Sequence, residues 1–335
     1  MLPLYALGGV DWLTTQTLYH GIAEMGEEAI VLCWPMTPYV SLGCHQDGDE
    51  FDASCGLPGL RRRVGGTLVY LDANQVFFQV ILNAKRLPSK SRPIDWYHLA
   101  LDPVVAYLGD RGLVGTLRPP ADILVGDRKI SGNAGGQIGD QMVVVGNLLL
   151  SFPHDVMVRV RNAPNQMLRE AFAASLHTHM LALREIPGHG EWTTDSVMQG
   201  LAHHYKESLG ARECLAPWDR WSNVLDRVAT ELQDPEWLAA PGMRLPYHQI
   251  KIREGVYLRS LRVGASDPRS SLVVEFHVDD GSIHSVWGAD GIGPGILPLG
   301  ARALSDINLP VQLRTALEEL TDLGRPIPWA PSVLA

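Results

Sequence analysis

Hydrophobic positions follow two different spacings along the first 150 residues. Helical spacing predicts amphipathic helices over about 12–25 and 95–109, although Asp102-Pro103 could kink or restart the second helix. Runs rich in valine, isoleucine and phenylalanine, separated by glycine turns, predict strands at 29–34, 40–43, 67–71, 76–82, 122–125, 128–131 and 142–150. This alternation is typical of an α/β (α+β) domain in which mixed sheets pack with helices.

The pattern changes beyond about residue 154. Helical spacing then covers the segments 165–183, 194–209 and 219–232. A proline-rich stretch from Pro235 to Pro246 ends this helical region. The strands predicted after it are 249–263, 271–278 and 282–287. With a closing helix at 311–321, this organisation predicts a large domain over residues 1–243 and a small α+β accessory domain over 244–335.

Composition and charge limit the class of protein. With 335 residues, 46% of them hydrophobic and 19% charged, the chain has the composition of an ordinary globular protein. Its formal net charge of −9 argues against sequence-independent binding of nucleic acid, and no stretch approaches the roughly 20 apolar residues of a membrane span. We therefore expect a cytoplasmic protein without nucleic-acid or membrane partners. Four cysteines without a CxxC pair predict neither a zinc site nor a disulfide framework.

One segment combines positive charge with glycine. Arg61-Arg62-Arg63 is followed by Val64-Gly65-Gly66 and then by a predicted strand. Adjacent glycines let backbone N–H groups approach an anion closely, and arginines bind carboxylates and phosphates. The segment therefore outlines an anion-binding site, while a solvated basic run with a tight turn is the alternative.

A second segment places a lysine beside small residues. A two-residue turn at Gly126-Asp127 puts Lys129 early on the returning strand, and Ile130-Ser131-Gly132-Asn133-Ala134 follows. A lysine held there can neutralise charge that builds up on a carbonyl and an α-phosphate as pyrophosphate leaves. An exposed hairpin lysine is the alternative.

In this order and spacing the segments resemble the lipoate–protein ligase family, within the superfamily of biotin and lipoate ligases and octanoyltransferases. Further matching positions are Val31-Leu32-Cys33-Trp34, Val40-Ser41-Leu42-Gly43, Gln46, Asp72-x-Asn74, Phe77-Phe78, Asp122 and Gly146-Asn147-Leu148-Leu149-Leu150. The resemblance covers about residues 10–210, and the last 90 residues resemble the family's accessory domain more weakly.

The resemblance implies a two-step, ATP-dependent reaction in the 1–243 domain. Lipoate or octanoate, a small-molecule fatty acid, attacks the α-phosphate of ATP to form acyl-AMP, and a lysine of a lipoyl carrier domain then takes the acyl group. Lys129 is the implied catalytic cation, and Asn74 and Asp122 are the implied ligands of Mg²⁺. The residues implied in ATP and substrate binding are Arg61, Arg62, Gly65, Gly66, Asn74, Asp122, Ser131, Gly132, Ala134 and Gly146, and those implied in the acyl pocket are Val69, Phe78 and Val80.

The sequence departs from the family pattern at several positions. Leu71 and Val145 stand where many members have histidine, and Ala121 stands where many have asparagine. Two alternatives therefore stay open: an acyltransferase that moves octanoyl or lipoyl groups between carriers without ATP, and a non-catalytic protein that binds an acylated carrier. A cysteine-dependent transferase is disfavoured because Arg118-Pro119-Pro120-Ala121 contains no cysteine. A biotin ligase is disfavoured because its Gly-Arg-Gly-Arg type of loop is missing.

Two further expectations concern charge and histidine. An exposed patch at Arg61–Arg63 would suit an acidic carrier surface. The pairs His177/His179 and His203/His204 are too close in sequence for both members to ligate one metal from a helix, so we expect them to be surface or core residues.

Overall fold

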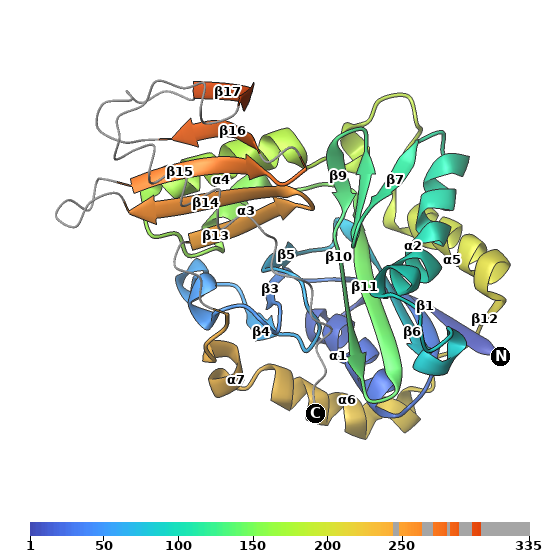
Figure 1. Cartoon of the computed structure of the whole chain (residues 1–335). Coiled ribbons are helices and arrows are strands. Elements are labelled where there is room, and N and C mark those ends of the chain that lie inside the picture. Colours follow the sequence, from blue (N-terminus) through green and yellow to red (C-terminus); the bar gives the residue numbers. More distant parts are fainter. Residues whose placement is uncertain (244–247, 263–270, 280–281, 288–296, 303–335) are drawn as a thin grey trace. The chain divides into compact units, whose positions relative to one another are not determined.

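The chain forms two compact units. The computed structural model describes residues 1–243, 248–262, 271–279, 282–287 and 297–302 (Figure 1). The first unit consists of Met1–Asn162 and Met180–Met243. The second takes in the described residues after Met243 together with Ala163–His179, which the sequence had assigned to the first domain. The predicted helix at 311–321 lies outside the described residues.

A six-stranded mixed sheet forms the centre of the first unit (Figure 1). Strand β1 runs parallel to both of its neighbours, β2 and β12, and the other pairs are antiparallel. In spatial order the strands are β10 (Asn133–Ile138), β11 (Gln141–Leu149), β6 (Gln75–Asn83), β2 (Ala29–Pro35), β1 (Leu2–Val10) and β12 (Ala211–Glu213). The mixed sheet with its helices confirms the predicted fold class.

Helices cover both faces of this sheet because side chains alternate along the central strands. On β6, Phe77 and Ile81 face one hydrophobic cluster, and Phe78 and Val80 face another. Helices α1 (Trp12–Glu24) and α6 (Trp218–Leu232) contribute to the first cluster, and α2 (Pro93–Asp110) and α5 (Thr194–Leu209) to the second. Helix α2 continues through Pro103 instead of restarting there.

Two three-stranded sheets carry the segments that the sequence singled out. One contains β4 (Gly59–Arg61), β3 (Tyr39–Leu42) and β5 (Val69–Leu71), and the other contains β7 (Gly115–Arg118), β8 (Asp122–Val125) and β9 (Arg128–Ser131). The β8–β9 hairpin turns at Gly126, whose φ is +60°. Both strands and the turn agree with the prediction. Two short helices, α3 (His154–Arg159) and α7 (Pro235–Ala239), complete the unit.

The second unit is an antiparallel sheet with one helix. Strands β13 (His248–Arg253), β14 (Val256–Arg262), β15 (Ser271–His277), β16 (Ser282–Trp287) and β17 (Leu297–Arg302) pair in sequence order, and α4 (Gln166–His179) packs on β13, β14 and β15. The single strand predicted at 249–263 is wrong, because the chain reverses at Gly255 with φ +83°. Among the residues that the structure describes, no helix has the length and apolarity to cross a bilayer.

Candidate active site

Lys129 and Asp122 form an ion pair on the β8–β9 hairpin. The Lys129 ammonium lies 2.9 Å from the Asp122 carboxylate, whose side chain is 1% exposed, while that of Lys129 is 15% exposed. A second segment fixes the backbone here, because the Leu181 N–H donates to the Lys129 carbonyl at 2.9 Å. The lysine is therefore a positioned, half-buried charge and not a freely exposed hairpin side chain.

Small residues leave room beside this ammonium group. A Cβ atom on Gly132 would lie 3.1 Å from Cε and 3.3 Å from Nζ of Lys129, so only glycine lets the lysine adopt its present position freely. The Gly132 N–H also donates to Oδ1 of Asn147 at 3.3 Å, and the Asn147 amide donates to Gln75. The neighbourhood thus combines one cation with polar amide groups from β6 and β11.

The turn after β9 is held by a second set of polar contacts. The Ser131 hydroxyl donates to Oδ1 of Asn133 at 3.2 Å, and the Asn133 amide donates to the Ala121 carbonyl. Gly146 lies opposite Asn133, where a Cβ atom would come within 1.7 Å of the same Oδ1. Ser131 and Gly146 therefore shape the turn beside Lys129, and their predicted contact with substrate stays a prediction.

The double glycine lies against the start of β10. A Cβ atom on Gly66, whose φ is +89°, would lie 3.2 Å from the Ala134 Cβ, and the Gly65 N–H donates to the Gly135 carbonyl at 3.3 Å. Gly43 approaches from the other side, where a Cβ atom would overlap the Gly66 carbonyl. The structure thus brings Gly65, Gly66 and Ala134 together, next to the strand that follows Lys129.

Arg62 is oriented toward backbone carbonyls. Its guanidinium donates to Gly65 O at 3.0 Å, Ser41 O at 2.9 Å and Thr67 O at 2.8 Å, and the residue is 4% exposed. Burial lowers the pKa of Arg62 from its ordinary value. Its N–H groups therefore fix the glycine loop in shape, and its predicted contact with phosphate stays a prediction.

Arg61 ties together two loops of the first unit. It is 1% exposed and donates to Gln46 O at 2.7 Å and to the Leu238 and Ala240 carbonyls, and its guanidinium lies 5.3 Å from the Trp237 ring centroid. Burial lowers its pKa as well. Like Arg62, Arg61 therefore stabilises the backbone around the glycine loop through hydrogen bonds to carbonyl groups.

Arg63 is paired with acidic residues and borders a buried histidine. Its guanidinium forms ion pairs with Glu24 and Glu231, and its backbone N–H donates to Nε2 of His20 at 3.0 Å. Because Nδ1 of His20 lies 2.7 Å from the Gln16 carbonyl, the neutral ring with its proton on Nδ1 satisfies both contacts. Burial, above all, lowers the pKa of His20 to about 3, and the backbone hydrogen bond opposes this only in part.

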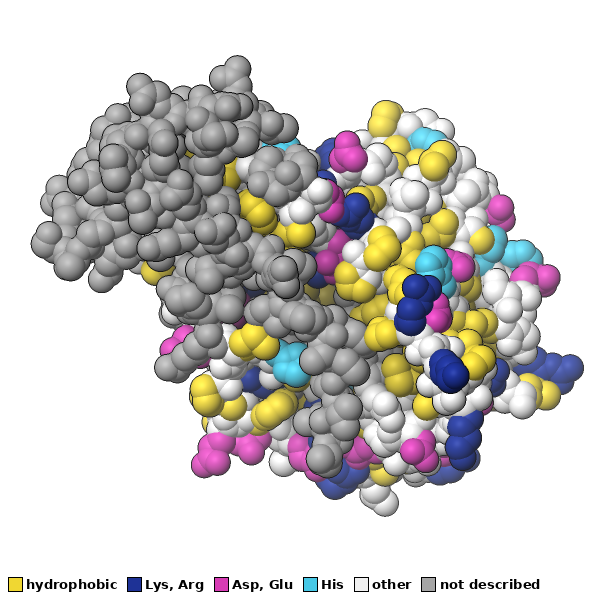
Figure 2. Space-filling view, viewed as in Figure 1, with side chains coloured by type: hydrophobic (Ala, Val, Ile, Leu, Met, Phe, Trp, Pro, Cys, Tyr) yellow, Lys and Arg dark blue, Asp and Glu magenta, His cyan; other side chains and the backbone are white. Residues whose placement is uncertain are grey.

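The expected basic patch at Arg61–Arg63 is therefore absent from the surface of the first unit. Two of its arginines are buried, and the third is neutralised by two carboxylates. On the face in Figure 2, basic and acidic side chains are interspersed. The prediction was wrong because consecutive charges in a sequence carry no information about burial.

Asn74 and Asp122 do not form a cage for Mg²⁺ by themselves. Oδ1 of Asn74 accepts a hydrogen bond from Arg184 at 3.0 Å, and the Asp122 carboxylate is paired with Lys129. Oδ1 of each residue already has a cationic partner, whereas protein-bound Mg²⁺ needs several oxygen ligands in an octahedron. These residues fit charge balance better than metal binding, and their predicted contact with Mg²⁺ stays a prediction.

The three residues predicted to line an acyl pocket lie on two sides of the large sheet. Phe78 and Val80 belong to the core beneath α2 and α5, and a Cβ atom on Gly146 would touch the Phe78 ring. Val69 packs against the other core, together with Leu71 and Val145. The structure therefore places the three residues in two different hydrophobic clusters, because Val69 lies on β5 of a separate small sheet whereas Phe78 and Val80 lie on the same face of β6.

Sequence reasoning gave no role to Asn147 or Gln75, which the structure connects to the lysine neighbourhood through Gly132. Asn147 directly follows Gly146 in the matching segment Gly146-Asn147-Leu148-Leu149-Leu150, so the sequence could have indicated it as a site residue. Arg184, which bonds Asn74 from a distant segment, had no such signal.

Comparison with known proteins identifies the family. Residues 9–206 match the family model described as the lipoyl protein ligase A/B catalytic domain. The chain belongs to this family. No curated protein matches the sequence. The match includes every member of the Lys129 neighbourhood, and the lipoyl protein ligase A/B family consists of enzymes of the ligase and transferase kind.

Solved structures of lipoate–protein ligases share the fold. A bipartite ligase from Thermoplasma acidophilum, described with its E2 lipoyl domain, superposes with a TM-score of 0.63 at 17% identity over 72% of this chain and 98% of its own. P. falciparum LipL1 in complex with lipoate gives 0.58 at 15% identity over 80% and 82%. A lipoate–protein ligase A bound with ATP gives 0.54 at 20% identity over 71% and 98%. At these identities the likeness establishes the fold of the family.

Proposed function

We propose that the protein is an ATP-dependent lipoate–protein ligase. In the first step, the carboxylate of lipoate or octanoate attacks the α-phosphate of ATP, which gives acyl-AMP and releases pyrophosphate. In the second, the amine of a carrier lysine attacks the acyl carbonyl and AMP leaves. Mg²⁺ accompanies ATP as its counter-ion.

The observation that carries the proposal is the half-buried ammonium of Lys129, which is held 2.9 Å from the buried Asp122 carboxylate. Negative charge grows on the phosphate in the first step and on the acyl carbonyl oxygen in the second, and a fixed cation in a low-dielectric environment stabilises both. Asp122 holds the ammonium in place, and Gly132 keeps the space beside it free. Related folds have been solved with lipoate and with ATP, which supports the choice of substrates.

A thiol-based transferase receives no support from the cysteines. The four cysteines are Cys33, Cys44, Cys55 and Cys214, none of which lies on β8, on β9 or in the turn at Gly132. Burial raises the pKa of Cys33 to about 12, so this thiol is a poor nucleophile. A transferase that used Lys129 with a bound thioester would need no ATP.

The test is formation of acyl-AMP without any carrier. The purified protein is incubated with ATP, Mg²⁺ and lipoate or octanoate, and the product is measured by mass spectrometry for the wild type, Lys129→Ala and Lys85→Ala. Lys85 is an exposed lysine of the same unit and serves as the control. We expect acyl-AMP from the wild type and from Lys85→Ala only.

Other outcomes would refute the ligase. If acyl-AMP is absent but octanoyl groups move from an acylated carrier to a lipoyl domain without ATP, the protein is a transferase. If neither reaction occurs and the protein still binds the acylated carrier, it is a binding protein.

A further inference from the structure

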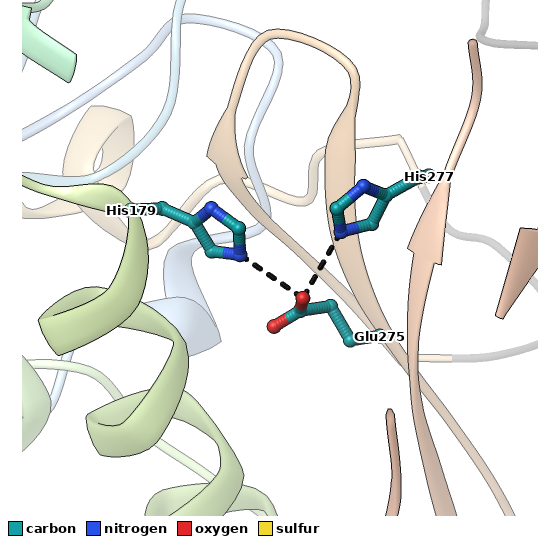
Figure 3. Close-up of side chains that lie close together, drawn as sticks. All are labelled: His179, Glu275 and His277. Carbon is teal, nitrogen blue, oxygen red and sulfur yellow. Dashed lines mark hydrogen bonds and ion pairs between the residues drawn. The ribbon is translucent and has the colours of Figure 1, made fainter. Parts of the chain in front are cut away.

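Three potential metal ligands of the second unit converge on one point. His179 is the last residue of α4, and Glu275 and His277 lie two positions apart on β15 and so share one face of that strand. Oε1 of Glu275 lies 3.0 Å from Nε2 of His179 and 3.0 Å from Nε2 of His277 (Figure 3). All three ligand atoms lie within 4.8 Å of one another.

The surroundings hold these side chains in place. The side chains of His179 and Glu275 are 8% and 7% exposed, and that of His277 is 14% exposed. Ser175, one turn before His179 on α4, donates its hydroxyl to the second carboxylate oxygen, Oε2. The His277 ring stacks flat on the His284 ring with their centroids 3.4 Å apart. Such support of ligands by neighbouring groups is typical of built metal sites.

The spacing fits a tetrahedral ion. Zn–N and Zn–O bonds of about 2.0–2.2 Å give ligand-to-ligand distances of about 3.3 Å. The two distances of 3.0 Å from Oε1 of Glu275 would open by a few tenths of an ångström, and the third separation, between the two histidine nitrogens, lies within 4.8 Å. Two imidazoles and one carboxylate suit zinc and its first-row neighbours, whereas Mg²⁺ and Ca²⁺ prefer oxygen ligands.

We propose that His179, Glu275 and His277 form a binding site for a divalent transition-metal ion of the zinc class, with water as the fourth ligand. The ion would clip α4 to β15 across 96 residues of sequence, in a small unit where such a cross-link stabilises the fold. The three ligands belong to the second unit and Lys129 belongs to the first, and the proposal does not depend on the ligase activity.

The test measures metal binding directly. The full chain is stripped of metal with a chelator, and Zn²⁺ is added back. After gel filtration removes free metal, bound Zn²⁺ is measured by inductively coupled plasma mass spectrometry. We expect one equivalent of Zn²⁺ and a higher temperature of unfolding, and Co²⁺ should give visible ligand-field bands in place of zinc. His179→Gln and His277→Gln should each weaken the affinity by at least about 100-fold.

Matched variants separate a metal site from a purely hydrogen-bonded cluster. His98→Gln is the control, because His98 is an exposed histidine beside a single carboxylate, Asp102, and this variant should bind Zn²⁺ like the wild type. Ser175→Ala keeps all three ligands and should weaken binding by about 10-fold, which tests the site even if a ligand variant fails to fold.

Three results would overturn the proposal. The first is a stripped wild type that binds neither Zn²⁺ nor Co²⁺. The second is binding by the folded ligand variants and by Ser175→Ala that is as tight as binding by the wild type. A thiolate-to-cobalt charge-transfer band would instead assign the metal to the accessible thiols, of which Cys214 is exposed.

Discussion

The ion pair between Lys129 and Asp122 has a structural role and a proposed catalytic role, and mutation can separate the two. Lys129→Met removes the ammonium and leaves a carboxylate that is 1% exposed without its cation. Asp122→Asn in the same chain then removes the stranded charge while keeping a polar side chain of nearly the same size. We expect the second change to restore stability and to leave activity lost.

The magnitude follows from burial. Removing one partner of a buried ion pair costs about 3–5 kcal/mol, and since Lys129 keeps 15% of its side chain exposed we expect the lower end, about 3 kcal/mol. At about 2–4 °C per kcal/mol for a unit of this size, the unfolding temperature of Lys129→Met should fall by roughly 6–12 °C. The double variant should lie within about 1 kcal/mol of the wild type, because no unpaired charge remains buried.

Two assays are needed for the single and double variants. Urea unfolding gives stability, and the initial rate of acyl-AMP formation gives activity, which should fall at least about 10²–10³-fold in both because the stabilising cation is gone. A double variant as unstable as the single one would show that the stranded carboxylate is not the cause. A single variant that keeps its rate would show that Lys129 is not the catalytic cation.

Three further predictions concern other positions. Gly132→Ala places a methyl group 3.1 Å from Lys129 Cε and should lower the rate of acyl-AMP formation about 10-fold or more. The control is Gly109→Ala, which has no atom within 4 Å of its added Cβ and should change rate and stability little. Equal effects of the two variants would contradict this account. Arg62→Lys should lower the free energy of unfolding by about 2–4 kcal/mol with little change in KM for ATP, because three backbone carbonyls lose their hydrogen-bond donors. A large rise in KM at unchanged stability would instead show that the guanidinium binds the phosphate. Burial lowers the pKa of His20 to about 3, so as the pH falls this histidine is protonated in the unfolded chain before it is protonated in the folded one. The free energy of unfolding of the wild type should therefore fall by about 2 kcal/mol between pH 7 and pH 5, and that of His20→Gln should not show this loss. Parallel pH profiles of the two proteins in urea unfolding would refute this prediction.

The predictability of this fold depended on local signals. Strands β8 and β9 were predicted residue for residue because Gly126 marks their turn, and with them came Lys129 and Asp122. Strand β10 was missed because Asn133-Ala134-Gly135-Gly136 contains no residue that favours strands, and its place is set by pairing with β11.

Properties set by tertiary structure were out of reach. The sequence displays the charge of Arg62 but not the carbonyl groups of Ser41 and Thr67 that surround it. In the same way, the sequence considered His179 only with His177, whereas its neighbours Glu275 and His277 lie almost 100 residues further on, where no spacing rule connects them.

The membership of α4 in the second unit has a consequence for synthesis on the ribosome. The helix is made before Met180–Met243, but Leu168, Phe172 and Leu176 on its buried face pack on strands that begin only at His248. At roughly 5–20 residues per second, about 100 residues separate His179 from His277 by some 5–20 seconds. During that interval the nascent chain exposes an apolar helix face, which makes it a substrate for chaperones, and a chain that stops at residue 243 would expose that face permanently.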